Sequence, residues 1–125
     1  MILLDIDDIL EIHKIVIEET GGDDGIRDYG MIESALYSTE AGFGDYQNNP
    51  SIEEKAARLC YGITMNHGFV DGNKRTAVNA MLSMLKLNNI DMLYSQKELV
   101  ETMLSLASGN IGYEEMLKWV KEHKA

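Results

Sequence analysis

The chain is 125 residues long, enough for a domain with a buried core, and we expect residues 1–125 to form a single domain. Its formal net charge of −10 makes nucleic acid and anionic membranes poor candidate partners, because both repel an acidic protein. The sequence shows neither an apolar run of transmembrane length nor a signal-peptide pattern, so we expect a cytoplasmic protein. The lone cysteine, Cys60, excludes an intramolecular disulfide, and with only three histidines a structural zinc site is not expected.

Three helices are predicted in the first half of the chain, over residues 5–20, 31–38 and 51–66. Asp5 and Ser51 stand where N-caps are expected, and an acidic residue follows each of them three positions later, as in a capping box. Apolar residues then recur at helical spacing. Gly21 and Gly22 end the first helix, because glycine readily adopts the conformations that close one.

Two segments of the first half carry turn residues instead of a helical pattern. Residues 23–30 are rich in glycine and aspartate, and we expect turns there, with a small hairpin flap near residues 22–30 as one arrangement. Residues 41–50 end at the single proline and are predicted to form a loop. Both segments connect predicted helices, so neither changes the helical class of the chain.

The second half predicts three more helices, over residues 74–88, 95–109 and 113–123. Ser95 and Glu98 form the pattern of another capping box, and Gly109 closes that helix. Cys60 lies on an apolar helical stripe, which predicts a buried and unreactive thiol. No set of alternating β-type runs competes with these helices, so we expect an all-α fold, a compact bundle of about six helices.

The most informative stretch runs from His67 to Arg75 and reads His-Gly-Phe-Val-Asp-Gly-Asn-Lys-Arg between two predicted helices. A loop that leads into a helix N-terminus presents unpaired N–H groups and the positive end of the helix dipole, which together bind anions. Lys74 and Arg75 stand where the dipole disfavours cations, so we expect a ligand to supply the negative charge. These features predict a phosphate-binding loop.

His67 and Asp71 add reactive groups to this loop. His67 extends an apolar stripe of the preceding helix, so it is either a core histidine at the helix end or a general base that takes the proton of an attacking hydroxyl. Asp71 is either a turn or N-cap residue or a ligand of Mg²⁺, whose charge offsets the repulsion between a carboxylate and phosphates. The neighbouring phosphate site favours the catalytic interpretation of both residues.

Three further residues are expected to shape the loop. Gly72 permits a positive φ and a close approach of the backbone to a ligand. Asn73 is expected to cap the following helix or to hold the loop. Phe69 is expected to anchor the loop in the core.

The pattern His67-x-Phe69-x-Asp71-x-Asn73-Lys74-Arg75-Thr76-Ala77 resembles the Fic/Doc family, and its Doc (death-on-curing) branch in particular. Further matches span most of the chain in the expected order: Gly21-Gly22-x-x-Gly25-Ile26-Arg27-Asp28, His13 in the first helix, and Glu33-x-Ala35-Leu36. The resemblance implies a Fic-like helical bundle with its active site in the loop that carries the motif.

The resemblance also implies roles for the loop residues. His67 would be the base and Asp71 the ligand of Mg²⁺, with ATP as co-substrate. Gly72, Asn73 and Arg75 would belong to the phosphate-binding loop.

Two positions separate the Doc branch from the wider Fic family, whose members usually transfer AMP from ATP to a protein hydroxyl. Lys74 replaces a glycine, so it fills space beside the phosphates and adds a contact to them, and Val78 replaces a second arginine. Doc-type members accordingly bind ATP in the reversed sense and transfer its γ-phosphate. Gly72 differs from the Doc pattern, since the prophage-type Doc has alanine there, and it matches the glycine of the wider Fic family. Transfer of AMP therefore remains an alternative.

Doc proteins are toxins of toxin–antitoxin pairs, and the resemblance implies a Phd-like antitoxin as partner. It further implies a kinase that phosphorylates a serine or threonine hydroxyl of a translation factor, elongation factor Tu in the family, and so inhibits translation. No glutamate of the chain is followed by glycine or asparagine, so the self-inhibiting motif of many Fic proteins is absent. Besides AMP transfer, the remaining alternative is a nucleotide- or partner-binding module without catalysis.

Arg27 is expected to lie near the loop 68–73, because a flap in this region of Fic-like folds holds the acceptor segment beside the nucleotide. The alternative is a surface arginine paired with Asp24 or Asp28.

Overall fold

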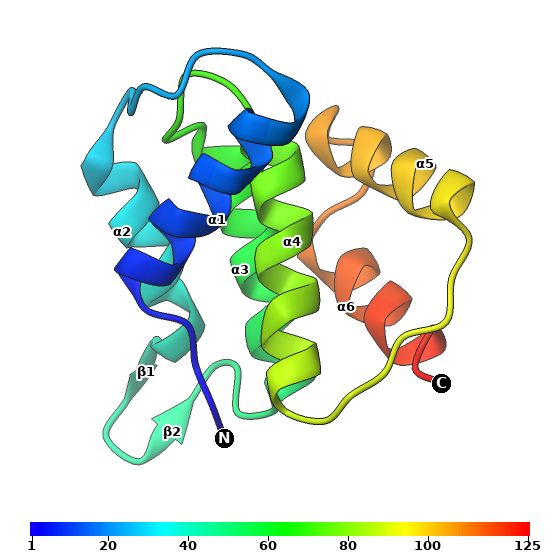
Figure 1. The fold of residues 1–125 in the computed structure, drawn as a ribbon. Helices are drawn as coiled ribbons and strands as arrows, with labels where there is room; N and C mark the ends of the chain where they lie inside the picture. Colours follow the sequence, from blue (N-terminus) through cyan, green and yellow to red (C-terminus); the bar gives the residue numbers. More distant parts are fainter.

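The computed structural model describes residues 1–125 and contains six α-helices, one 3₁₀ helix and one small hairpin (Figure 1). The helices are α1 (Ile6–Thr20), α2 (Tyr29–Tyr37), α3 (Ile52–Asn66), α4 (Asn73–Leu87), α5 (Gln96–Ala107) and α6 (Tyr113–Glu122). The 3₁₀ helix η1 covers Ser38–Glu40, and the hairpin pairs β1 (Gly42–Phe43) with β2 (Tyr46–Gln47). The predicted all-α bundle of about six helices is confirmed.

Side-chain caps determine where several helices begin. Asp5 and Ser51 accept hydrogen bonds from the backbone N–H three residues later, at 2.9 and 3.1 Å, and both predicted capping boxes are complete. The capping box predicted at Ser95 is only half formed. Ser95 accepts from the N–H of Glu98, whereas the Glu98 carboxylate contacts Nε2 of His123 at 2.6 Å. Glu98 therefore joins the start of α5 to the end of α6.

Helix α2 begins two residues before the predicted start. The Asp28 side chain accepts from the N–H of Met31 at 3.2 Å and so caps a helix whose first residue is Tyr29. Gly62 of α3 allows α2 to approach closely, since a Cβ there would lie only 3.0 Å from the Cα of Ala35. The close packing of α2 against α3 fixes the end of the segment that connects α1 to α2.

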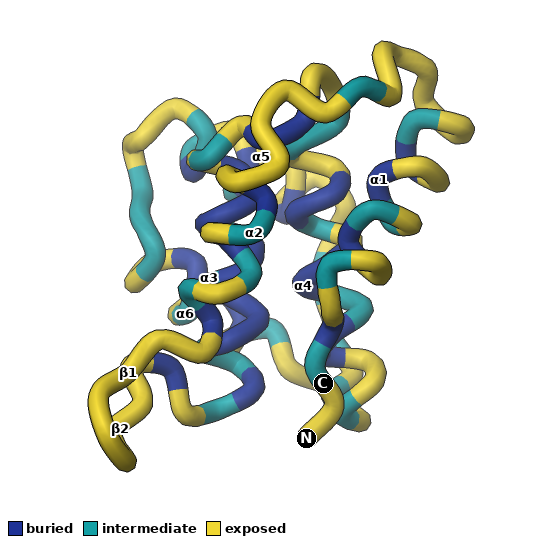
Figure 2. Tube along the Cα trace, turned by 90° about the vertical axis from the view of Figure 1, so that its left-hand side faces the viewer, coloured by how far each residue is buried: buried dark blue, intermediate teal, exposed yellow.

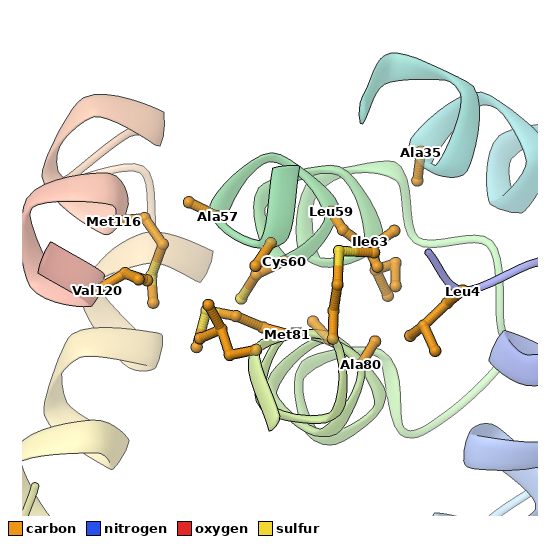
Figure 3. Close-up of a cluster of buried hydrophobic side chains, with 14 of the residues drawn as sticks. Leu4, Ala35, Ala57, Leu59, Cys60, Ile63, Ala80, Met81, Met116 and Val120 are labelled. Carbon is orange, nitrogen blue, oxygen red and sulfur yellow. The ribbon is translucent and has the colours of Figure 1, made fainter. Parts of the chain in front are cut away.

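Helix α3 lies at the centre of the bundle and packs against α2, α4 and α6, while α1 packs against α4 and contacts α2 (Figure 1). Side chains of α3 and α4 meet in the core, with Met116 and Val120 of α6 at one side and Leu4 at the other (Figure 3). Because α3 and α4 are packed on several sides, the loop that joins them has rigid support at both ends.

Cys60 lies fully buried in this core. Burial raises the pKa of its thiol to about 12, because an apolar environment disfavours the thiolate. The predicted buried and unreactive thiol is therefore confirmed. None of the helices combines the length and the apolar composition that crossing a bilayer requires.

The hairpin lies within residues 41–50, the segment predicted to be a loop, and not within residues 22–30, where a hairpin flap was expected. Its strands are only two residues long, and Gly44 adopts a positive φ of 60° in the turn between them. The hairpin projects from the body of the protein as an exposed segment (Figure 2). Strands this short leave no alternating pattern in the sequence, which explains why the prediction missed them.

Candidate active site

The loop that joins α3 to α4 has a left-handed residue at each end. His67 closes α3 with φ 49° and ψ 47°, and Gly72 opens α4 with φ 81° and ψ 16°. The left-handed conformation is unfavourable for a residue with a side chain, so the backbone at His67 has to be held by its surroundings. The loop lies beside the end of α1 and the segment that connects α1 to α2 (Figure 1).

Gly72 has the positive φ that was expected of it, and its backbone packs closely against α1. Its φ is positive, and a Cβ at this position would lie 3.1 Å from Cδ1 of Ile17 and 3.4 Å from Cγ1 of Val16. The loop backbone therefore lies directly against α1.

Asn73 holds the loop and does not cap α4. Its Oδ1 accepts from the N–H of Phe69 at 3.0 Å, and its Nδ2 donates to the Phe69 carbonyl at 2.9 Å. Phe69 is buried, with 1% of its surface exposed, and anchors the loop in the core as predicted. These two bonds fix the distance between the middle of the loop and the first residue of α4.

The N-terminus of α4 is open. No side chain caps it, and the first backbone bond of the helix runs from the N–H of Thr76 to the carbonyl of Gly72 at 2.9 Å. The N–H groups of Asn73, Lys74 and Arg75 therefore have no partner within the protein. The side chains of Lys74 and Arg75 are exposed and form no ion pair. Free N–H groups and two free cations at one helix end are suited to an anion.

His67 does not continue the buried stripe of α3, and the interpretation as a core histidine is wrong. The residue is exposed, because its left-handed backbone turns it away from the face of α3 that carries Ile63. The imidazole forms no hydrogen bond or ion pair with another residue. It is therefore accessible to a second molecule that approaches the loop.

Arg27 lies at the C-terminal end of α3, next to this histidine. Its Nε donates to the carbonyl of His67 at 2.5 Å, and its Nη2 donates to the carbonyl of Asn66 at 3.1 Å. The alternative, an ion pair with Asp24 or Asp28, does not occur. A cation at a helix C-terminus complements the helix dipole, so Arg27 caps α3 and holds the strained backbone of His67.

Residues 22–30 form a flap that pairs with the site loop instead of with itself. Ile26 and Phe69 form an antiparallel bridge, and the N–H of Val70 donates to the carbonyl of Gly25 at 3.0 Å. The carbonyl of Gly68 accepts from the N–H groups of Arg27 and Asp28, at 2.8 and 2.9 Å. The expected hairpin is therefore replaced by a short ladder between two loops that are far apart in the sequence.

Asp71 is exposed and is held by two other segments. Its Oδ2 accepts from the N–H of Asp23 in the flap at 2.8 Å, and its carbonyl accepts from Nε2 of His13 in α1 at 2.8 Å. Its Oδ1 accepts no hydrogen bond from the protein. Nowhere do three or more His, Cys, Asp or Glu side chains gather to hold a metal ion. A metal at this loop would therefore take most of its ligands from a substrate and from water, as Mg²⁺ does with nucleotides.

The motif residues thus gather at one end of the molecule, where α3 ends and α4 begins. A free imidazole, an exposed carboxylate and two free cations surround an uncapped helix N-terminus. This set can bind a phosphate chain and take a proton from an approaching hydroxyl. Sequence reasoning did not assign the contacts that His13 and Asp23 make with Asp71. The signals for His13 were its match to the Fic/Doc pattern and its place as a polar residue on the apolar face of α1.

Known proteins are similar to most of this chain. Residues 3–85 match the model of the Fic/DOC family. The protein named Toxin Doc from Mycolicibacterium smegmatis is 35% identical over 89 residues, which cover 71% of this chain and 66% of that protein. The protein named Protein kinase doc from Escherichia phage P1 is 28% identical over 105 residues, which cover 84% of this chain and 82% of that protein. The chain belongs to the Fic/DOC family.

Proposed function

We propose that this chain is a Doc-type toxin, a protein kinase that transfers the γ-phosphate of ATP to a serine or threonine hydroxyl of a translation factor. The observation that carries the proposal is the free imidazole of His67 beside an uncapped helix N-terminus with two unpaired cations. The relatives named Toxin Doc and Protein kinase doc support it. By family resemblance, the translation factor is elongation factor Tu.

The residues of the loop fit ATP with Mg²⁺. The free N–H groups of α4, together with Lys74 and Arg75, would hold the phosphates. The exposed Oδ1 of Asp71 would hold Mg²⁺. When bound, Mg²⁺ reduces the negative charge on the phosphate oxygens, so that a hydroxyl oxygen can approach them.

His67 would act as the general base. Its imidazole would accept the proton of the acceptor hydroxyl as the hydroxyl oxygen forms its bond to the γ-phosphorus. The bond from that phosphorus to the oxygen bridging the β- and γ-phosphates would break in the same step, and ADP would leave. Arg27 would contribute by holding the His67 backbone. The flap of residues 22–30 would hold the acceptor segment of the protein substrate beside the nucleotide. The side chain of Lys74 supports transfer of the γ-phosphate rather than of AMP, because it occupies the place of the glycine of AMP-transferases.

We further propose that a Phd-like antitoxin binds the groove that runs over α4 between α1 and α5. Two hollows of about 670 and 580 Å³ share Asn79, Leu82 and Tyr94 and so form one continuous groove. Its floor is largely apolar, and α1 contributes carboxylates to its rim. An amphipathic helix with basic residues along one side would match this surface. The groove reaches Lys74 and Arg75, so its occupant would cover the phosphate site.

Labelled ATP tests the proposed function. The chain is incubated with Mg²⁺, a bacterial lysate and ATP labelled at either the α- or the γ-phosphate. We expect only the γ-label to reach a protein, and no transfer by the His67→Ala variant. Protein labelled from the α-phosphate would make the chain an AMP-transferase. If neither label is transferred, the result favours a binding module without catalysis.

A further inference from the structure

His13 is a buried polar residue on the apolar face of α1. Its side chain is 4% exposed and lies on the same face as Ile9 and Val16. Buried polar groups are nearly always hydrogen-bonded, and Nε2 of His13 donates to the carbonyl of Asp71 at 2.8 Å. The ring also stacks on Phe69, with the centroids 3.7 Å apart and the planes inclined by 9°. His13 thus contacts two residues of the loop that joins α3 to α4.

The hydrogen bond from His13 holds the Asp71 carbonyl in the direction that the backbone at Gly72 gives it. In a continuous helix this carbonyl would accept from the N–H of Arg75, four residues later. It does not, because the left-handed Gly72 turns it toward α1, where His13 binds it. The N–H of Arg75 is therefore left without a partner. The bond from His13 therefore holds this carbonyl away from the N–H of Arg75, at the open N-terminus of α4.

The carboxylate of Asp71 is fixed at the same time. Its Oδ2 accepts from the N–H of Asp23, while its carbonyl accepts from His13. A residue that is held through both its carbonyl and its carboxylate keeps little freedom in its backbone or in χ1. Its Oδ1 is left without a partner on the exposed side of the loop.

We propose that His13 is a positioning residue of the phosphate site. It lies beneath the loop and acts through Asp71, by keeping the N–H groups of α4 open and the carboxylate in place. The proposal rests on the proposed function in one respect, namely that the N-terminus of α4 receives the phosphates of the nucleotide. The arrangement of the loop itself does not depend on that function.

Two variants separate the hydrogen bond of His13 from its packing. His13→Phe keeps an aromatic ring against Phe69 but removes the donor, whereas His13→Gln keeps a donor that can reach a carbonyl. His123→Gln is the matched control, because it changes a hydrogen-bonded histidine at the end of α6, outside the loop that joins α3 to α4. If His13→Phe does not fold, His13→Met takes its place, since methionine adapts to irregular space in a core.

Two measurements are made on each folded variant. The backbone amide signals of Asp23, Gly72 and Arg75 are recorded by NMR without any ligand, and the affinity for ADP with Mg²⁺ is measured by calorimetry. We expect His13→Phe to shift these signals and to weaken ADP binding by ~10- to 100-fold, as the loss of an outer partner of a site does. His13→Gln and His123→Gln should retain the signals. Their affinity for ADP should stay within about threefold of that of the unaltered chain, which is less than the tenfold change that corresponds to about 1.4 kcal/mol.

The outcomes separate the two proposals. Unchanged signals and affinity in a folded His13→Phe variant would make His13 a core residue only. Shifted signals with unchanged affinity would also overturn the positioning role, because the loop would then change without consequence for binding. If the unaltered chain does not bind ADP, the proposed function fails, and the amide signals alone decide whether His13 holds the loop.

Discussion

His67 shows how one backbone conformation decides the role of a residue. The spacing of the sequence places it on the buried stripe of α3, and the left-handed turn moves it out to solvent. The cost of that turn is offset by the bond from Arg27 to the His67 carbonyl and by the ladder between the flap and the loop. Strain that is held in place by surrounding contacts is common where a side chain has to be presented to a substrate.

We expect His67→Ala to lose transfer activity by a factor of ~10²–10⁴, the usual contribution of a general base. The fold should remain intact, because the imidazole is exposed and has no partner in the protein. Initial rates of phosphate transfer measure the loss, and thermal unfolding of the same sample serves as the control. A folded variant with nearly full activity would exclude His67 from the reaction.

For Asp71 the informative change is Asp71→Asn, which removes the charge but keeps an oxygen that can accept from the N–H of Asp23. We expect the concentration of Mg²⁺ needed for half-maximal activity to rise at least tenfold, because a neutral amide is a poor ligand for that ion. Titration of activity with Mg²⁺ measures the change. An unchanged metal requirement at normal activity would show that Asp71 only holds the flap.

The reactive residues could be predicted from the sequence because they lie together in nine consecutive residues. The residues that hold them could not. His13 and Asp23 contact Asp71 from positions 58 and 48 residues away, and one of these contacts uses a backbone N–H that no residue type reveals. The side chain of Arg27 could be placed near the loop only through the family resemblance, and its use as a helix cap required the structure.

At the scale of elements, local signals predicted the helices and tertiary contacts decided the rest. Capping residues and glycines placed most helix ends within one or two residues of those observed. The flap of residues 22–30 pairs with a loop 40 or more residues away, so its sequence could not distinguish this arrangement from a hairpin. Glu98 shows the same competition at a helix end, since His123 takes the carboxylate that the local pattern assigns to a capping box.

The contact between α5 and α6 is expected to depend on pH. Partial burial lowers the pKa of His123, but its bonds to the Trp119 carbonyl and to the Glu98 carboxylate outweigh burial and raise the pKa above its ordinary value of 6.5. A pKa that is higher in the folded chain than in the unfolded chain adds to the free energy of unfolding. This contribution is complete below about pH 6.5 and is lost as the pH rises through the pKa of the folded chain.

His123→Gln should therefore lower the free energy of unfolding more at pH 6 than at about pH 9, because a raised pKa adds stability only while the imidazole is protonated. Urea unfolding at the two pH values measures the difference between the variant and the unaltered chain. Glu98→Gln is the control, because it removes the carboxylate and should reduce the pH dependence in the same direction. A destabilisation that is equal at both pH values would contradict the assignment.

At the scale of the whole molecule, the site and the groove are both formed before any partner binds. The loop that joins α3 to α4 is held by α1, the flap and the ends of α3 and α4, and the groove over α4 leads to it. A site on fixed helix ends requires little rearrangement to become active. Because the chain lacks the self-inhibiting motif of many Fic proteins, its restraint is proposed to come from a separate antitoxin.

Expression of the chain alone should accordingly arrest bacterial growth, and co-expression of an antitoxin that fills the groove should restore it. Lys74→Ala should relieve the arrest, because it removes one of the two cations at the α4 N-terminus. Growth curves at matched levels of soluble protein measure both effects. Harmless expression of the unaltered, soluble chain in a host without an antitoxin would favour the binding module without catalysis.

The site at the loop that joins α3 to α4 is proposed to transfer the γ-phosphate of ATP to a translation factor. The most direct test is the intact mass of purified elongation factor Tu after incubation with the chain, Mg²⁺ and ATP. We predict a gain of one phosphate on a serine or threonine, and no gain with the His67→Ala variant under the same conditions. A gain of AMP, or an unchanged mass with a folded and ATP-binding chain, would contradict the account.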